Sequence, residues 1–317
     1  MLSPEILTAA IPQAIRSINV TGWGPKTSGK VRETYQRGNH RLLIATDRIS
    51  AFDRILGVIP YRGQVLNQLS VWWFEQTNKI VRNHLISSPD PNVTLAYDAQ
   101  TIPIEMIVRG YITGVTSTSL WTLYQKGERQ PYGIELPDGL QKNDPLPKAI
   151  VTPTTKSSDG GHDLPLTPDA ILRERIVSPE LWQQMEKAAL ALFSHGQKVA
   201  QNAGLILVDT KYEFGLIDGE LAVIDEIHTP DSSRYWTQES YKRGQPEDYS
   251  KEYLRNWFKQ MGYTGEGTPP PLTPQLAVEV ATRYIHVYES LTSSVFEPAE
   301  SPAEARILDN IANMELL

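Results

Sequence analysis

Hydrophobic and polar positions alternate over short distances in the first third of the chain. Apolar runs between turn residues are typical of antiparallel strands, and three such runs span residues 30–36, 41–47 and 101–112. Residues 62–80 differ, because their apolar side chains recur at helical spacing. The pattern therefore predicts a largely antiparallel sheet over residues 20–110, interrupted by one helix.

The rest of the chain predicts several helices and one long loop region. Residues 178–204 begin with a Ser-Pro pair and end at Gly204, which are typical start and stop signals of a helix. Residues 273–291 and 301–313 also begin with Thr-Pro or Ser-Pro and predict two C-terminal helices. Residues 125–170 are rich in Pro, Gly, Asp and Lys, and we expect long loops with little regular structure there.

Composition narrows the class of protein. A chain of 317 residues suits two domains, with one large α/β unit as the alternative. The absence of Cys excludes disulfides, thiolate metal sites and Cys nucleophiles. The longest apolar runs are far shorter than the roughly 18 residues of a membrane helix, and the N-terminus lacks a signal-peptide pattern. From these two observations we expect a cytoplasmic or organelle-matrix protein that does not bind membranes. The net charge of −7 argues against nucleic-acid binding, because neutralising phosphates requires a basic face.

A predicted hairpin within residues 205–224 has one apolar and one charged face. Alternation along its first strand separates the two sets of side chains. The apolar set is Ile206, Val208, Thr210, Tyr212 and Phe214, and the charged set is Asp209, Lys211 and Glu213. Asp218-Gly219 is a strong signal for the turn that joins the two strands.

The length of that turn determines which charges meet. A two-residue turn would set Lys211 opposite Glu226, whereas a three-residue turn with a left-handed Gly219 would set Glu213 opposite Asp225. In both registers acidic side chains gather around the lysine, and such hard oxygen ligands suit Mg²⁺ together with nucleotide phosphates. A solvated sheet face with cross-strand ion pairs is the alternative interpretation.

A glycine-bearing segment near the N-terminus is a second candidate for phosphate binding. Residues 21–35 contain Gly22, Gly24 and Gly29 close to Lys26 and Lys30. A hairpin of this kind can cover a triphosphate with backbone N–H groups and a lysine charge, although an ordinary hairpin fits equally well. The segment matches neither the P-loop nor the Rossmann pattern.

Polar residues also follow two strand-like runs and the hairpin. Asp47, Arg48, Ser50 and Asp53 come just after residues 41–45, where strand ends commonly hold functional groups and a capped turn is the alternative. A second loop, residues 152–163, contains Lys156, His162 and Asp163 and is suited to a polar ligand. After the hairpin, a turn of Pro, Asp and two Ser presents Arg234, whose guanidinium suits phosphate or carboxylate.

Taken together, five segments in order resemble the SAICAR synthetase family. They are residues 29–35, 45–53, 103–114, 152–163 and 207–236, and the likeness continues to about residue 257. The resemblance implies an ATP-dependent ligase of purine biosynthesis that joins L-aspartate to 5-amino-1-(5-phosphoribosyl)imidazole-4-carboxylate (CAIR), releasing ADP and phosphate through an acyl phosphate. It also implies an α+β fold related to ATP-grasp enzymes and kinases. We expect an antiparallel ATP-binding domain over residues 1–108 and an α/β substrate- and metal-binding domain with C-terminal helices over residues 109–317.

The resemblance further implies roles for matched residues. The catalytic set would be Lys211, Glu213 and Asp225, and the last two would bind Mg²⁺. The ATP-binding set would be Gly29, Lys30, Arg32, Glu105 and Lys211, with the strand at residues 101–108 running past the adenine. The substrate-binding set would be Asp47, Arg109, Lys156, His162, Asp163, Asp231, Ser233 and Arg234.

Two positions depart from the family pattern. Glu33 stands where the family has Asp, which lengthens an acidic side chain and keeps its charge. Val115 stands where the family has Ser, so a hydroxyl expected near the ligand phosphate is absent. Thr116, Ser117 or Ser119 are candidates to replace it, and this form of the segment is similar to the plant and cyanobacterial branch.

Two other functions compete with the ligase. A small-molecule or protein kinase is one, because residues 212–215 (YEFG) are similar to the kinase D-F-G element. The chain lacks the kinase catalytic loop H-R-D-x-x-x-x-N, which argues against it. A nucleotide-binding module without catalysis is the other, and the retained Lys, Glu, Asp and Arg residues argue against that.

Overall fold

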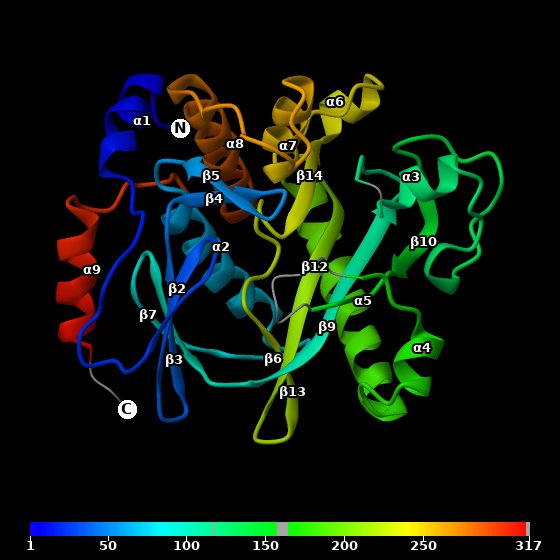
Figure 1. Cartoon of the computed structure of the whole chain (residues 1–317), viewed down its shortest axis with the longest axis horizontal. Helices are drawn as coiled ribbons and strands as arrows, with labels where there is room; N and C mark the ends of the chain where they lie inside the picture. The colour runs from blue at the N-terminus through cyan, green and yellow to red at the C-terminus, as the bar shows by residue number, and fades with distance from the viewer. Residues whose placement is uncertain (117, 157–163, 315–317) are drawn as a thin grey trace.

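The computed structural model describes residues 1–116, 118–156 and 164–314, and two sheets form its frame (Figure 1). A five-stranded antiparallel sheet has the order β1-β2-β3-β8-β7. Its strands are β1 (Lys26–Ser28), β2 (Arg32–Arg37), β3 (His40–Ala45), β7 (Leu85–Asp90) and β8 (Val93–Tyr97). This sheet belongs to the region in which alternation predicted antiparallel strands, and that prediction is confirmed.

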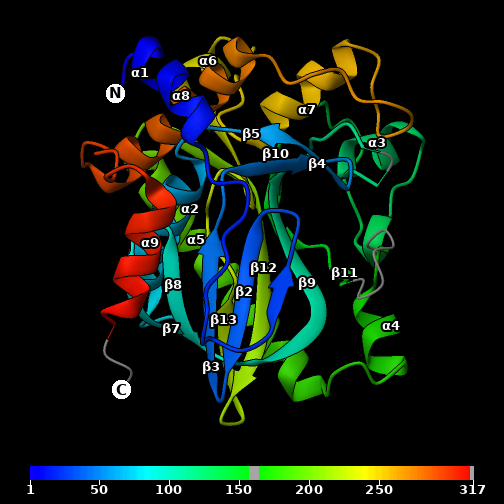
Figure 2. The ribbon, with the colours of Figure 1, turned by 60° about the vertical axis from the view of Figure 1, so that its left-hand side comes forward.

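A seven-stranded sheet has the central order β10-β9-β12-β13-β6, with β11 beside β9 and β14 beside β12. The pairing of β13 with β6 is parallel, and the other pairings in this sheet are antiparallel. The strands are β6 (Arg82–Asn83), β9 (Gln100–Tyr111), β10 (Pro145–Val151), β11 (Thr154–Thr155), β12 (Leu205–Ile217), β13 (Glu220–Ile224) and β14 (Ser233–Thr237). A two-stranded ribbon of β4 (Arg48–Ala51) and β5 (Arg54–Val58) lies at the end of the molecule where the helices gather (Figures 1 and 2).

The helices pack on the outer faces of the sheets and at one end of the molecule. They are α1 (Pro4–Ala10), α2 (Arg62–Thr77), α3 (Leu120–Gln125), α4 (Pro168–Arg173), α5 (Pro179–Asn202), α6 (Gln238–Lys242), α7 (Lys251–Gln260), α8 (Pro274–Thr292) and α9 (Ala303–Ala312). Short 3-10 turns occur at Ile11–Gln13 and Pro131–Gly133. Among the described residues, no helix is both long enough and apolar enough to span a bilayer.

Each sheet has one face that packs against helices and one that faces the other sheet. On β3, Leu42 and Ile44 belong to the core that includes α9, whereas Leu43 lines the cavity between the sheets. On β9, Ile104 and Met106 pack in the core beneath α5. The period of two along each strand thus separates core residues from cavity residues. The inner faces of the two sheets consequently form the walls of one cleft.

The helix predictions are largely confirmed. α2 occupies most of residues 62–80, and α5 begins directly after Ser178, whose Oγ accepts a hydrogen bond from the backbone N–H of Leu181 at 3.2 Å. α8 is capped in the same way by Thr273. The last helix differs, because α9 begins at Ala303 after Pro302 and Ser301 provides no cap. Its Ser-Pro pair therefore marks the start of the helix only approximately.

The prediction of long loops over residues 125–170 is wrong in part. β10 and β11 pair with β9, and α4 begins at Pro168 after Thr167, whose side chain caps it. The pairing of β10 with β9 includes a register shift between Pro145 and Ile150. β10 is a strand because its backbone pairs with β9. Its composition, rich in Pro and Lys, is not typical of a strand, so the sequence alone did not indicate it.

The hairpin has the two-residue turn. Asp218 and Gly219 both have positive φ, 56° and 81°, as a type I′ turn requires. Ile217 therefore pairs with Glu220, and Glu213 lies opposite Ile224. The alternative register, which would have placed Glu213 opposite Asp225, is wrong for this structure.

The predicted apolar face of β12 is correct only for its second half. Tyr212 and Phe214 lie in the core beneath α5, but Leu205 and Leu207 join them there in place of Ile206 and Val208. The pairing with β14 shifts by one residue between Leu207 and Asp209. This bulge reverses the alternation, because an extra residue moves every following side chain to the other face.

Replacing Gly63 by Ala should destabilise the fold by about 1–3 kcal/mol, on the scale of an overpacked core. Gly63 lies at the start of α2, and a Cβ there would overlap the carbonyl oxygen of Ala45 and approach Nδ2 of Asn92 to 2.7 Å. Urea unfolding measures the change. Ser70→Ala in the same helix is the control, because the buried Ser70 hydroxyl has no hydrogen-bond partner among the described residues. Equal stability of the two variants would contradict the close contact.

Candidate active site

A cavity of about 350 Å³ lies between the two sheets. One part of its lining is largely apolar, with Val31, Leu43, Tyr97, Ala99 and Ile224. The other part is charged, with Lys30, Arg32, Lys156, Lys211, Glu213, Asp225, Glu226, Asp231 and Lys251. Both kinds of lining come from both sheets, so the cavity forms only when the sheets pack together. Pockets with an apolar wall and a few convergent polar groups are typical ligand sites.

Alternating charges run from the floor of the cavity, where Lys211 and Glu213 of β12 lie, to Glu105 of β9. Glu213 lies directly opposite Glu105, and two carboxylates in that position repel each other. Lys211 separates them, because its Nζ donates to Glu105 Oε1 at 2.6 Å and to Glu213 Oε1 at 2.8 Å. Lys156, which follows β11, forms a second ion pair with Glu213. The four side chains form a continuous line of opposite charges.

The two lysines keep Glu213 ionised. Burial by itself favours the neutral acid, but the charges of Lys211 and Lys156 outweigh it and lower the pKa of Glu213 to about 2. The pKa of Lys211 moves upward in turn, because the attraction of Glu213 and Glu105 exceeds the cost of its burial. At neutral pH the cavity thus contains a full carboxylate charge and a full ammonium charge side by side.

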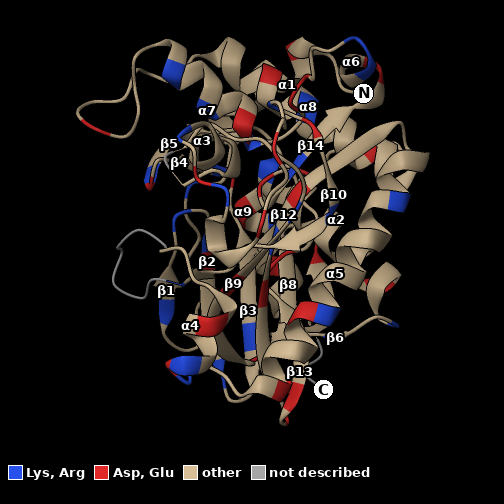
Figure 3. Ribbon diagram, turned by 90° about the vertical axis from the view of Figure 1, so that its right-hand side faces the viewer, with Lys and Arg blue, Asp and Glu red and all other residues tan. Residues whose placement is uncertain are grey.

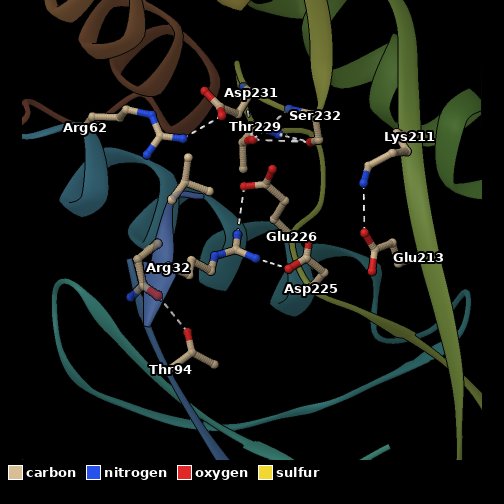
Figure 4. Close-up of polar contacts among 12 residues, drawn as sticks. Arg32, Arg62, Thr94, Lys211, Glu213, Asp225, Glu226, Thr229, Asp231 and Ser232 are labelled. Carbon is tan, nitrogen blue, oxygen red and sulfur yellow. Dashed lines mark hydrogen bonds and ion pairs between the residues drawn. The ribbon is translucent and has the colours of Figure 1, made fainter. Parts of the chain in front are cut away.

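Arg32 reaches into the cavity from the five-stranded sheet and meets two acidic residues that follow β13. Its guanidinium pairs with Asp225 and also with Glu226, where Nη2 and Oε2 are 2.9 Å apart (Figure 4). Asp225 has a φ of 69°, so the chain leaves the strand at this residue. Figure 4 shows Asp225 and Glu213 on opposite sides of one space, the first with Arg32 and the second with Lys211.

The donor set suits a divalent cation that is bound together with phosphate. Glu213 and Asp225 both line the cavity and supply carboxylate oxygens, which Mg²⁺ prefers. Among residues 1–116, 118–156 and 164–314, no group of three or more acidic or His side chains has the arrangement of a metal site. Two carboxylates with phosphate oxygens are nevertheless the usual mode of binding for Mg²⁺ with a nucleotide. The residues present therefore fit a metal that arrives with its nucleotide.

A buried ion-pair group, which we name the Asp231 cluster, closes the cavity near the helices. It consists of Arg62, Asp231, Lys251 and Tyr284, from α2, the β13–β14 loop, α7 and α8. Asp231 Oδ2 accepts from Arg62 Nη2 at 2.5 Å and from Lys251 Nζ at 2.9 Å, and Oδ1 accepts from the Tyr284 hydroxyl at 2.7 Å. Burial would raise the pKa of Asp231, but Arg62 and Lys251 bring it well below the ordinary range. Asp231 thus joins three helices to the loop.

A second charged group, the arginine cluster, lies at the junction of β9, β12, β14 and α7. Asp209 is opposite both Arg109 and Arg234 in the sheet, and it lies 3.6 Å and 3.3 Å from their guanidinium groups. Glu252 is 3.6 Å from Arg234, and Thr152 accepts a hydrogen bond from Arg109 at 2.8 Å. Figure 3 shows charges of both signs gathered around β12 and β14.

The arginine cluster has unused hydrogen-bonding capacity. Nε of Arg234 is buried and lacks a hydrogen-bond partner among the described residues, and Nη1 faces Asp209 Oδ2 at 3.3 Å without forming a hydrogen bond. A buried guanidinium with free donors is suited to binding an anion with two or more oxygens. Ser233, predicted to join Arg234 in substrate binding, instead shares a 2.7 Å hydrogen bond with Thr210.

The structure places Asp47, a predicted substrate-binding residue, outside the cavity between the sheets. Asp47 is buried behind β3, where its carboxylate accepts from the backbone N–H groups of Ile15 and Gly63 at 2.8 Å. Burial raises the pKa of Asp47 to about 6 despite those hydrogen bonds. Its position therefore indicates a structural role, and it lies away from the cavity. His162 and Asp163 lie outside the described residues.

The N-terminal glycine segment forms the β1–β2 hairpin, and Gly29 and Lys30 line the cavity. Lys30 also pairs with Asp53 of the β4–β5 turn. Lys26 is directed elsewhere, because its Nζ donates to Ile18 O at 2.7 Å. Of the two lysines in this segment, Lys30 is thus the one placed for phosphate.

The two departures from the family pattern have different consequences. Glu33 is fully buried and pairs with Arg48 at 2.6 Å, so the longer acid keeps an ion pair within the sheet. Near Val115, Ser119 is already used, because its Oγ caps α3 and donates to the carbonyl oxygen of Thr116. Ser117 lies outside the described residues. Lys259 approaches the same loop and donates to the Val115 carbonyl oxygen at 3.0 Å.

Sequence reasoning missed Arg62, Glu226 as a partner of Arg32, and Lys251. Arg62 lies 169 positions from Asp231, and nothing in its helical pattern indicates a buried charge. Lys251 belongs to the last segment of the resemblance, residues 250–258, which was a usable signal. Most of that segment lies in α7, and Lys251, the first residue of α7, lines the cavity.

Comparison with known sequences supports the resemblance. The family model described as SAICAR synthetase matches residues 26–271. The phosphoribosylaminoimidazole-succinocarboxamide synthase of Legionella pneumophila (strain Lens) is 51% identical over 298 residues, which are 91% of this chain and 95% of the relative. The chloroplastic phosphoribosylaminoimidazole-succinocarboxamide synthase of Arabidopsis thaliana is 48% identical over 300 residues, which are 92% of this chain and 72% of the relative.

Solved structures have the same fold. One described as SAICAR-synthase from Saccharomyces cerevisiae complexed with SAICAR has a TM-score of 0.77 at 33% identity, covering 90% of this chain and all of that one. Another, described as SAICAR synthetase (Type-2) in complex with ADP, has a TM-score of 0.66 at 22% identity and covers 86% of this chain and 100% of that one. At that lower identity the likeness shows the fold alone.

Proposed function

The chain belongs to the SAICAR synthetase family, and from this premise we propose how the residues of its cavity divide the work of the reaction. The activity is that of a phosphoribosylaminoimidazole-succinocarboxamide synthase, an ATP-dependent ligase of purine biosynthesis. It joins L-aspartate to CAIR. The observation that carries the proposal is the line of ion pairs through Lys156, Glu213 and Lys211, which line one cavity beside an apolar pocket, with Glu105 behind Lys211.

ATP would occupy the cavity between the sheets. Its adenine fits the part lined by Val31, Leu43 and Ile224, beside β9, and its phosphates fit the part lined by Lys30 and Lys211. The β1–β2 hairpin would lie over the phosphates with Gly29 and Lys30, and the Gly29 N–H, which donates to the Arg32 carbonyl oxygen at 2.8 Å, would hold the turn of that hairpin. Cations from both sheets support this orientation, because the triphosphate is the most highly charged part of the nucleotide.

The chemical step requires that a carboxylate becomes a better electrophile. A carboxylate oxygen of CAIR attacks the γ-phosphorus of ATP, the bond to the bridging oxygen breaks, and ADP leaves with the electron pair. The amine of aspartate then attacks the acyl carbon and displaces phosphate, losing a proton as the C–N bond forms. The first attack brings anions together, so preorganised positive charge is the main contribution that the protein can make.

Mg²⁺ would be bound by Glu213 and Asp225 when ATP is present. The metal would neutralise phosphate charge and orient the γ-phosphoryl group. The two carboxylates now pair with Lys156, Lys211 and Arg32, and those cations are placed to contact phosphate oxygens. The carboxylates would thus bind the metal that contacts the phosphates, and the cations would contact the same phosphates directly.

CAIR would be bound by the arginine cluster and the adjoining loop. Arg109 and Arg234 present buried guanidinium groups, and the Arg234 donors that form no hydrogen bond in the described structure support a phosphate or carboxylate there. Ser233 would join them through its hydroxyl, which is now hydrogen-bonded to Thr210, because its backbone N–H donates to the Thr229 carbonyl oxygen at 2.8 Å. Asp231 and Lys156 would lie between the two ligands, since both line the cavity.

The domain boundary and the cellular location stay predictions. The division into residues 1–108 and 109–317 falls within β9, which is continuous from Gln100 to Tyr111. A cytoplasmic location also remains a prediction, and the Arabidopsis thaliana relative is named as chloroplastic.

The test of the ligase is an ADP-release assay with ATP and Mg²⁺, from which CAIR or L-aspartate is omitted in turn. We expect full turnover only when both are present, with formation of the succinocarboxamide product. ADP release that is indifferent to both omissions would contradict the ligase and favour an ATPase or kinase. Nucleotide binding without turnover under any condition would favour a binding module.

A further inference from the structure

We propose that Lys251 is a further catalytic residue, which contacts the γ-phosphoryl group during its transfer from ATP to the substrate carboxylate. The proposal rests on the proposed function, because it deepens the role of the same cavity. Lys251 is the first residue of α7, and its side chain lines the cavity together with Arg32, Lys211 and Asp225. None of the roles assigned above to phosphate contacts includes it.

The charges of the Asp231 cluster do not cancel. Arg62 and Lys251 both donate to the single oxygen Oδ2 of Asp231, so two positive charges share one carboxylate. Arg62 is 1% exposed and its other terminal nitrogen donates to the carbonyl oxygen of Thr46, which fixes it away from the cavity. The excess positive charge is therefore presented to the cavity by Lys251. An ammonium group with three donors has capacity left for an anion.

Lys251 is held firmly in this place. Its backbone N–H donates to Pro230 O at 2.9 Å, and its Nζ lies 2.9 Å from Asp231 Oδ2. Burial lowers the pKa of Lys251, with Asp231 opposing the shift. A phosphate oxygen would therefore favour the charged ammonium form and restore part of the solvation lost on burial.

The position of Lys251 indicates which anion it meets. The next residue, Glu252, is 3.6 Å from Arg234 of the arginine cluster, where CAIR is proposed to bind. Lys251 itself lines the nucleotide cavity, which the side chains of Arg109 and Arg234 do not line. It thus lies at the boundary between the two proposed ligands, where a phosphoryl group must pass from one to the other.

The step balances without any additional reactant. The bond from the γ-phosphorus to the bridging oxygen breaks and its electron pair leaves on ADP, while a carboxylate oxygen of CAIR forms a new bond to that phosphorus. Lys251 keeps its proton and donates a hydrogen bond to a non-bridging oxygen. Since negative charge is redistributed over those oxygens during transfer, a fixed cation there lowers the barrier.

The test compares nucleotides with and without the γ-phosphoryl group. For Lys251→Met we expect ADP affinity within twofold of the wild type, about tenfold weaker binding of a β,γ-imido ATP analogue, and kcat about thirtyfold lower. Lys251→Arg should recover part of both losses. Lys187→Met, which replaces an exposed lysine in α5, is the matched control and should leave all three values unchanged.

Three results would overturn the proposal. The first is unchanged kcat, the second is equal weakening of ADP and of the analogue, and the third is a raised KM for CAIR with unchanged affinity for the analogue. The third result would assign Lys251 to the acceptor carboxylate instead. If the Met variant does not bind ADP, the same comparison is made with Lys251→Gln, which keeps a donor for Asp231. Failure of the ligase function itself is distinguishable, because the wild-type enzyme would then release ADP without CAIR and aspartate.

Discussion

Replacing Glu213 by Gln is expected to reduce turnover at least about a hundredfold while the fold remains intact, on the scale of losing one electrostatic catalytic group. Gln has nearly the same shape, so the change removes mainly the negative charge. That charge lies between Lys211 and Lys156 and is one of two proposed to hold Mg²⁺. Lys211 would retain its 2.6 Å contact with Glu105, so the strand pairing should persist.

Steady-state kcat at saturating ATP, CAIR and aspartate measures the effect, and thermal unfolding shows whether the variant is folded. Glu220→Gln on the same hairpin is the matched control, because its side chain is 73% exposed and pairs only at the surface with Arg82. It should keep normal activity. Near-normal turnover in Glu213→Gln would place the metal site elsewhere.

The elements with strong local signals could be predicted from the sequence. α5 combines a Ser cap, Pro179 and a stop at Gly204, and it begins and ends close to those residues. The Asp218-Gly219 turn is also recognisable from the sequence, but its register is not, and positive φ at both residues shows that the turn has two residues. Local conformational preferences suffice in these cases because each signal and its effect lie within a few residues.

Features that depend on distant residues could not be predicted in this way. The bulge at Val208 arises where β14 pairs with β12, and β10 becomes a strand because β9 is next to it. In the kinase-like segment, Phe214 is buried within β12, so the likeness of this segment to a D-F-G loop is local only. Tertiary pairing decided each of these outcomes.

In the candidate site, too, local patterns predict some features and the pairing of distant residues decides others. Alternation indicated that Lys211 and Glu213 share a charged face, and both line the cavity. The partner of Asp225, however, is Arg32, which is 193 positions away on the other sheet. Asp47 followed a strand as functional residues often do, yet backbone N–H groups occupy its carboxylate. A pattern can identify a charged side chain, but the packing of two sheets decides what that side chain meets.

Replacing Asp231 by Asn is expected to destabilise the fold by about 3–5 kcal/mol, the cost of leaving a buried charge without its partner. Arg62 is 1% exposed, and its ion pair in the described structure is with Asp231 at 2.5 Å. Tyr284 would also lose a charged acceptor. The loss should be larger than that of a surface ion pair, because water cannot solvate the remaining guanidinium group.

The same ion pair predicts a dependence on pH. The pKa of Asp231 is lower in the folded protein than in the unfolded chain, because the attraction of Arg62 and Lys251 exceeds the effect of burial. Its contribution to stability is therefore complete above the ordinary aspartate pKa of about 3.9 and decreases as the pH falls below it. Urea unfolding at pH 7 and at pH 3 measures both effects, and the difference in stability between wild type and Asp231→Asn should be smaller at pH 3.

The matched control is Asp138→Asn, which removes a surface partner of Arg129 and should cost less than about 1 kcal/mol. A loss equally small for Asp231→Asn at pH 7 would mean that Arg62 finds another partner, and the Asp231 cluster would then not be what holds α2, α7 and α8 to the loop.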